Sequence, residues 1–186
     1  MRRETAALFL CLIGLVPLAA ADVPAPRREP SLTLDGAMPE DLKALVRTTW
    51  HRFVRAFPAH ADCLHAVTVA GAWELDDRAR YVPSRTTVTV RIPGTKPNLS
   101  ASLVHEFAHH LEFTCPQGVG IRSAFKAAQG LSSGLPWRGG PTWELTPSEQ
   151  WAEAVAEYVL RARPGHARVS VTEEAIGVIR SWAVGH

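Results

Sequence analysis

The residues most able to do chemistry lie in the segment 98–114, NLSASLVHEFAHHLEFT, where three histidines and two glutamates interrupt an apolar run. If this segment is a helix, His105 and His109 lie one turn apart on one face. Two imidazoles at this i, i+4 spacing can bind one tetrahedral metal ion. Glu106 lies beside the open coordination position, where a carboxylate can take a proton from metal-bound water. The HExxH pattern therefore predicts a zinc (Zn²⁺) site with Glu106 as general base.

A third protein ligand must come from elsewhere in the chain, because two histidines do not complete such a site. The candidates are Glu149, Glu153 and Glu157 on a predicted helix over 146–163. Glu149 and Glu153 border its apolar face, whereas Glu157 is rotated toward solvent. Two hypotheses remain open for Glu149. It is the third ligand, which we favour, or it reaches back to Thr146 in a capping box and leaves Glu153 for the metal.

Two further polar residues follow the histidine pair. His110 lies 100° past His109 on the helical wheel, which predicts an ordinary surface or capped histidine. Glu112 has two interpretations: it hydrogen-bonds a ligand histidine from outside the coordination shell, or it is a plain surface glutamate.

The pairing of HEFAH with SEQWAEAVAEYV some forty residues later resembles the gluzincin metallopeptidases, in particular small bacterial members and the catalytic domain of anthrax lethal factor. The resemblance covers roughly residues 86–160 and implies a zincin-like fold. It also implies one role for each matching residue: zinc ligands for His105, His109 and Glu149, the general base for Glu106, and a supporting residue for Glu153.

The chain departs from this family at the residue that stabilises the oxyanion. Related enzymes often use a tyrosine or histidine near the second helix, but the loop before that helix contains Trp143 and no tyrosine. Tyr158 is predicted to point away from Glu149 and into the core. Tyr81 and His166 remain as unassigned candidates.

The elements that must position these residues are several helices and two short strands. Helical periodicity and capping residues predict five helices, over 38–58, 98–114, 121–129, 146–163 and 172–184. β-Branched runs predict strands at 64–70 and 86–92. We expect an α+β domain with a small twisted β-sheet packed against several helices. Strand 86–92 would form the upper rim of a cleft for an extended peptide, and residues 130–145 a long functional loop.

The N-terminus predicts export. The charged MRRE precedes the apolar TAALFLCLIGLVPLA, and Ala19 and Ala21 fit a small-x-small cleavage site. The apolar run is too short for a stable membrane span, and Cys11 lacks the preceding small residues typical of lipidation. We therefore expect a signal peptide over 1–21 and a secreted or periplasmic mature chain without a membrane span.

The remaining chain predicts a flexible proline-rich leader over 22–37 and a single zincin-like domain over 38–186. Cys63 and Cys115 form an even pair once the signal peptide is removed, and an oxidising compartment favours a disulfide between them. The net charge of +2 without a basic stripe argues against a nucleic-acid partner. The oligomeric state is not predicted.

Together these features predict a secreted zinc-dependent metallopeptidase, with zinc-bound water as nucleophile and a peptide or protein as substrate. The alternative is a non-catalytic zinc-binding or peptide-binding module with a vestigial protease site. An open coordination position favours the enzyme, since structural zinc sites are closed by four protein ligands. The missing oxyanion tyrosine favours the module.

Overall fold

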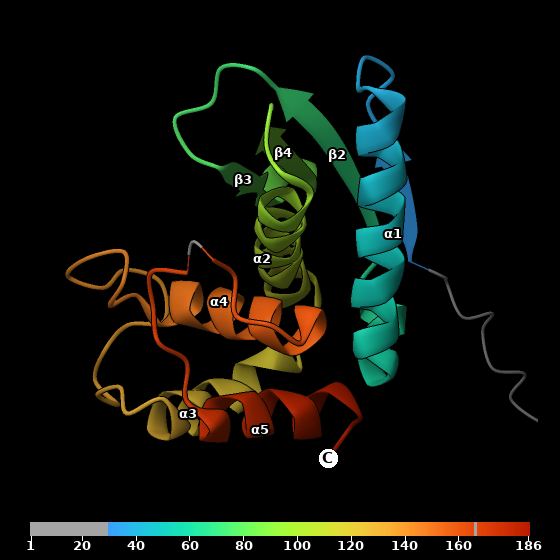
Figure 1. Cartoon of the computed structure of the whole chain (residues 1–186). Helices are drawn as coiled ribbons and strands as arrows, with labels where there is room; N and C mark the ends of the chain where they lie inside the picture. The colour runs from blue at the N-terminus through green and yellow to red at the C-terminus, as the bar shows by residue number, and fades with distance from the viewer. Residues whose placement is uncertain (1–29, 166) are drawn as a thin grey trace, which may run out of the picture.

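The computed structural model describes residues 30–165 and 167–186, which form a four-stranded mixed sheet and five α-helices (Figure 1). The predicted α+β class, a small sheet against several helices, is confirmed. The predicted signal peptide over 1–21 and the first half of the predicted leader, residues 22–29, lie outside the described residues. No helix in the described part of the chain is long and apolar enough to span a membrane.

The sheet has the strand order β1-β2-β4-β3. β1, β2 and β4 pair in parallel, and β3 pairs antiparallel with β4 at one edge. The strands run over Ser31–Leu34 (β1), Ala66–Ala72 (β2), Ala79–Val82 (β3) and Thr87–Arg91 (β4). Alternate valines of the two central strands are buried in the core: Val67, Val69, Val88 and Val90. These valines belong to the β-branched runs that predicted β2 and β4 from the sequence.

Two features of the sheet correct the sequence analysis. The predicted flexible leader over 22–37 contains β1, which pairs with β2. The sequence does not predict β3, which covers the outer edge of β4, so the prediction that strand 86–92 forms the rim of the cleft is wrong. β3 forms that rim instead. Strands of four residues are too short for periodicity to reveal, because their stability comes from partners distant in sequence.

The five predicted helices are present, with ends within three residues of the predicted ones. They run over Glu40–Ala56 (α1), Lys96–Thr114 (α2), Gly118–Ala128 (α3), Pro147–Leu160 (α4) and Glu173–Ala183 (α5), and short 3₁₀ helices occupy Pro58–Cys63 (η1) and Pro83–Arg85 (η2). Proline at the first position of α4 starts the helix without losing a hydrogen bond. The Thr172 side chain caps α5 by accepting a hydrogen bond from the Ala175 N–H.

Helix α2 runs through the centre of the molecule, between α1 and the crossing helix α4 (Figure 1). Its apolar face is buried, and Phe107 packs edge-on against Trp50 of α1 with ring centroids 5.0 Å apart. Because this face is committed to the core, the neighbouring face with His105 and His109 turns toward α4. α3 and α5 lie side by side below α4 (Figure 1).

Cys63 and Cys115 form a disulfide, with their Cα atoms 5.1 Å apart. Cys63 ends η1, and Cys115 directly follows α2. The bond therefore ties the end of the histidine-bearing helix to the segment that leads into β2. This is the cysteine pair that the sequence predicts.

Candidate metal centre

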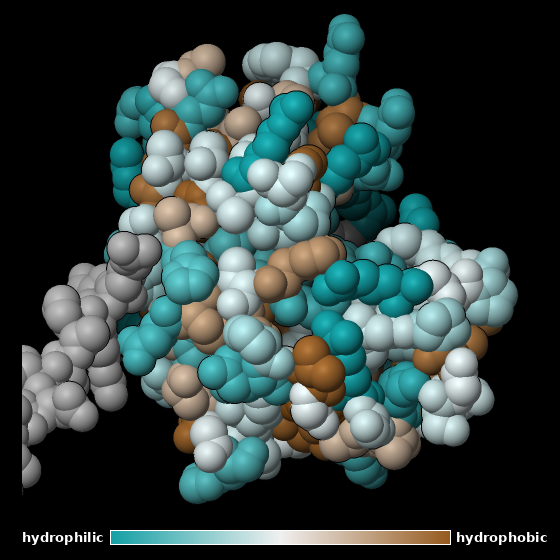
Figure 2. Space-filling model, turned by 180° about the vertical axis from the view of Figure 1, so that it is seen from behind, coloured by the Kyte–Doolittle hydropathy of each residue, from teal (hydrophilic) through white to brown (hydrophobic). Residues whose placement is uncertain are grey.

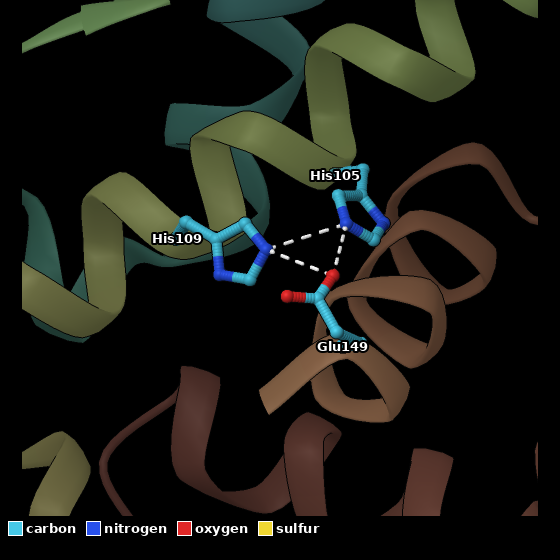
Figure 3. Close-up of side chains that lie close together, drawn as sticks. All are labelled: His105, His109 and Glu149. Carbon is cyan, nitrogen blue, oxygen red and sulfur yellow. Dashed lines mark hydrogen bonds and ion pairs between the residues drawn. The ribbon is translucent and has the colours of Figure 1, made fainter. Parts of the chain in front are cut away.

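Three side chains from two helices converge at the crossing of α2 and α4 (Figure 3). Glu149 Oε2 lies 3.1 Å from His105 Nε2 and 3.4 Å from His109 Nε2. The two imidazole Nε2 atoms are 3.3 Å apart. Within the described residues, His105, His109 and Glu149 form a group with one potential ligand atom each, and these atoms all lie within 4.8 Å of one another.

The donor set fits a tetrahedral zinc ion. Ligand atoms bound to zinc at 2.0–2.1 Å in tetrahedral geometry are separated by about 3.3 Å, and the three distances between these atoms range from 3.1 to 3.4 Å. Two imidazole nitrogens and one carboxylate oxygen are ligands that zinc accepts in catalytic sites, where a fourth position stays open. The residues present are therefore suited to zinc.

Glu149 points at the histidines and does not form the capping box. The Thr146 hydroxyl donates to the Thr142 carbonyl oxygen at 2.9 Å and accepts a hydrogen bond from the Gly140 N–H at 3.0 Å. Glu149 makes its contacts with His105 and His109 instead. Of the two hypotheses for this residue, the geometry agrees with the one in which it faces the metal site.

Each of the two histidines has a second carboxylate at its other ring nitrogen. Glu153 Oε1 lies 3.5 Å from His105 Nδ1, and Glu112 Oε2 lies 3.5 Å from His109 Nδ1. A carboxylate at Nδ1 favours a proton there and leaves Nε2 free to bind a metal. Glu112 is thus the buried partner of a histidine, as one of its two interpretations held, and not a surface residue.

The charges around the group favour a cation. Burial alone would lower the pKa of His105, but Glu149 and Glu153 raise that pKa to about 10. Burial alone would raise the pKa of Glu149, but hydrogen bonds from His105 and His109 hold it well below its usual range. The carboxylates therefore stabilise positive charge at this point, and a divalent ion supplies positive charge there.

Glu106 lies on the same helix but outside the three-residue group, in the wall of the adjoining cleft. The residue is buried, at 7% exposure, and burial raises the pKa of its carboxyl group. The backbone N–H of Tyr81, in β3, donates a hydrogen bond to this carboxylate. A carboxylate held beside the group in this way can act as a base.

The cleft has a volume of about 710 Å³ and lies between the sheet edge and the loop that precedes α4. β3 contributes Arg80 and Tyr81 to one wall, and the loop contributes Arg138 and Trp143 to the other. The Trp143 ring stacks on His105, with centroids 5.9 Å apart. From behind, Figure 2 shows an indentation between the upper part of the molecule and the lobe that projects to the right, bordered largely by hydrophilic side chains.

His110 corrects the sequence analysis, because it is fully buried and not a surface residue. Its Nε2–H donates to the Leu64 carbonyl oxygen, so Nδ1 carries no proton and accepts a hydrogen bond from the Tyr81 hydroxyl at 3.0 Å. Burial lowers the pKa of His110 to about 4, which keeps the ring neutral. The helical wheel places this residue correctly, but packing of α2 against Trp50 of α1 and against β3 covers its face.

The candidates for an oxyanion donor have different outcomes. Tyr81 lines the cleft, but the proton of its hydroxyl is engaged by the buried His110. Tyr158 packs against Phe57, and its hydroxyl donates to the Ala56 carbonyl oxygen, in agreement with a core position. His166 lies outside the described residues.

Sequence reasoning missed two loop residues that reach the centre, Trp137 and Arg138. Both donate hydrogen bonds to Glu112. Their one sequence signal is the presence of a tryptophan and an arginine in a long glycine- and proline-rich loop, which indicates function without indicating a partner.

Comparisons of the chain with protein-family models, with curated proteins and with solved structures gave no match.

Proposed function

We propose that this protein is a secreted zinc-dependent metallopeptidase that hydrolyses bonds in peptide or protein substrates. The observation that carries the proposal is the convergence of His105, His109 and Glu149 at tetrahedral spacing, with Glu106 held separately in the cleft wall. A zinc ion bound by the three residues would supply a Lewis acid that polarises the scissile carbonyl group and lowers the pKa of water.

Glu106 has the position and environment of a general base in this reaction. Its carboxylate would accept a proton from the attacking water and pass it to the leaving amine. Burial and the raised pKa favour proton uptake, and the Tyr81 N–H holds one side of the carboxylate in place.

β3 is the element that we propose for aligning the substrate. The Arg91 N–H donates to the Arg78 carbonyl oxygen, so hydrogen-bonded pairs alternate from there along the antiparallel ladder. In this register Ala79 and Tyr81 direct their backbone groups away from β4. The Tyr81 N–H is engaged by Glu106, so the backbone groups of Ala79 and the Tyr81 carbonyl oxygen are the ones offered to a substrate. An extended peptide can pair with such an edge, which would place its bonds across the metal group.

The resemblance to gluzincins supports the same proposal. The HEFAH motif lies on α2 and the SEQWAEAVAEYV motif on α4, and these helices bring the ligand candidates together. We include in the proposal a zincin-like fold and export by the N-terminal signal peptide. The disulfide is consistent with an oxidising compartment.

The second candidate function is a non-catalytic zinc-binding or peptide-binding module. It is favoured by one observation, the engagement of the Tyr81 hydroxyl by His110, which leaves that hydroxyl without a proton for an oxyanion. The two functions differ in turnover and not in zinc binding.

The test combines metal analysis with a broad peptide-library assay on the mature protein. One zinc ion per chain and cleavage of library peptides are expected. Glu106→Gln should keep the zinc and lose about 10²–10⁴-fold in turnover, because a general base contributes this much. Zinc binding without any cleavage by the native chain would favour the module, and native turnover in Glu106→Gln would remove Glu106 from the reaction.

A further inference from the structure

The carboxylate of Glu112 joins the metal group to the loop that precedes α4. Its side chain is 3% exposed. Glu112 Oε1 accepts a hydrogen bond from Trp137 Nε1–H at 2.7 Å and another from Arg138 Nε–H at 2.8 Å. Glu112 Oε2 is buried and faces His109 Nδ1 at 3.5 Å, and it has no hydrogen-bond partner among the described residues. One oxygen therefore holds the loop while the other faces a ligand histidine.

Trp137 contacts both helices that carry the ligand candidates. Its indole N–H donates to Glu112 on α2, three residues after His109. Its carbonyl oxygen accepts a hydrogen bond at 2.9 Å from the N–H of Ser148, which directly precedes Glu149 on α4. A single loop residue thus connects positions close to two of the three metal-binding side chains.

Arginines and aromatic rings hold this connection in place. The Arg138 guanidinium lies 3.6 Å from the ring centre of Phe113 and pairs with Glu112. Arg122, on α3, lies 5.2 Å from the Trp137 ring centre and 3.5 Å from Glu112. A carboxylate is costly to bury unless charged and hydrogen-bonding partners surround it. Arg122 belongs to α3, but Trp137 and Arg138 belong to the loop, so Glu112 has its full set of partners only when the loop is seated.

We infer that Trp137 and Arg138 are positioning residues that act through Glu112 to set the zinc affinity of the site. The seated loop fixes the orientation of His109 through Glu112 and the approach of Glu149 through Ser148. The inference rests on the zinc site of the proposed function, but it concerns metal binding and not turnover. Release of the loop would turn His109 and separate the ligand-bearing helices, so zinc would be held more weakly.

The test measures the zinc dissociation constant of the mature protein by competition with a chromophoric chelator. Glu112→Met keeps the length of the side chain and removes both oxygens, and zinc affinity should fall by about 10–100-fold, as for other residues that orient a ligand histidine. Trp137→Phe keeps an aromatic ring and removes the N–H, and affinity should fall by about fivefold, the typical worth of one hydrogen bond. The absorption spectrum of bound Co²⁺ should change in both variants, because the ligand geometry changes.

The double variant tests whether Trp137 acts through Glu112. Affinity in Glu112→Met/Trp137→Phe should equal that of Glu112→Met alone, since the hydrogen bond is already lost. Additive losses would mean that Trp137 acts by another route and would overturn the inference.

Lys126→Met is the matched control. Lys126 tethers the same loop through the Ser133 and Leu135 carbonyl oxygens, but it has no hydrogen bond to Glu112 in the described structure. Its variant leaves the bonds from Trp137 and Arg138 to Glu112 in place, so the loop stays seated at Glu112 and zinc affinity should remain native. Thermal unfolding of the metal-free proteins measures the general stability loss of every variant. Native zinc affinity in Trp137→Phe and Glu112→Met would overturn the inference while leaving the proposed site intact. Failure of the native chain to bind zinc would overturn both.

Discussion

Glu149 and Glu153 lie one turn apart on α4, yet they contact different atoms of His105. Glu149 faces Nε2, where a metal would bind, and Glu153 faces Nδ1. Glu153 Oε2 is buried and has no hydrogen-bond partner among the described residues. The same residue type therefore has two roles here, and the direction of each side chain decides which.

These roles predict different losses of zinc. Glu149→Ala removes a ligand, so stoichiometric zinc should be lost, as in His105→Ala or His109→Ala. Glu153→Ala removes only the partner of His105 Nδ1, so affinity should fall by about 10–100-fold. Native mass spectrometry and chelator competition measure both. If Glu149→Ala kept full zinc and Glu153→Ala lost it, the assignment of the two glutamates would have to be exchanged.

Removal of the Tyr81 hydroxyl should lower the stability of the protein and have little effect on turnover. Tyr81→Phe would leave the buried His110 Nδ1 without its donor, at a cost of about 1–3 kcal/mol in the free energy of unfolding. Turnover should fall less than about tenfold, because this proton is already engaged, whereas loss of an oxyanion donor costs about 10²–10³-fold. Denaturant unfolding and the kcat of the variant measure the two effects. A loss of turnover in the larger range would identify Tyr81 as the oxyanion donor.

At the scale of the elements, the crossing of α2 and α4 creates the metal group. The amphipathic pattern of α2 assigns its apolar face to α1 and the sheet, which leaves the histidines to meet α4. β3 adds the second wall of the cleft and brings the Tyr81 N–H to Glu106. A helix pair and an edge strand are thus sufficient to bring together the three ligand candidates, Glu106 and one wall of the cleft.

The Cys63–Cys115 disulfide should stabilise the fold at the end of α2. Its two cysteines are 52 residues apart, and closing a loop of that length stabilises a fold by about 4 kcal/mol in the chain-entropy model. A Cys63→Ser/Cys115→Ser double variant should lose about this much unfolding free energy. Mass spectrometry of the mature protein without reduction should identify one peptide pair. Two alkylatable thiols in the native secreted chain would contradict the prediction.

At the scale of the whole molecule, His60 connects the first half of the chain to its last helix. Its ring stacks on Trp182 of α5 at 3.7 Å, and His60 Nε2–H donates to the Trp182 carbonyl oxygen at 2.8 Å. Burial lowers the pKa of His60 below its usual value. The unfolded chain therefore binds a proton more readily than the folded chain does as the pH falls below about 6.5.

This linkage predicts a loss of stability in acid. The free energy of unfolding of the native protein should fall between pH 7 and pH 5, and His60→Gln should reduce the slope because it removes the titrating group. The penalty of His60→Gln should thus be larger at pH 7 than at pH 5. His51→Gln, at an exposed position of α1, is the matched control and should keep the native slope. Denaturant unfolding across this range measures the difference, and equal slopes in native protein and His60→Gln would contradict it.

The sequence by itself predicted the features that depend on residues close together in the chain. The i, i+4 spacing of His105 and His109 follows from the helix repeat, so the pair and the adjacent Glu106 could be singled out without a fold. The five helices follow from hydrophobic periodicity and capping residues, and the two central strands follow from β-branched runs. The cysteine pair follows from counting.

The tertiary structure alone decided the features that depend on how distant elements meet. Because α2 crosses α4, Glu149 contacts the histidines and does not reach back to Thr146 in a capping box. The same crossing pairs Glu153 with His105. Packing of α2 against α1 and β3 buried His110, and the long-range pairing of β3 replaced β4 as the rim. The contact of Trp137 with Glu112 spans 25 residues. No local pattern encodes such contacts, because each depends on the packing free energy of the assembled core and not on the residues adjacent in sequence.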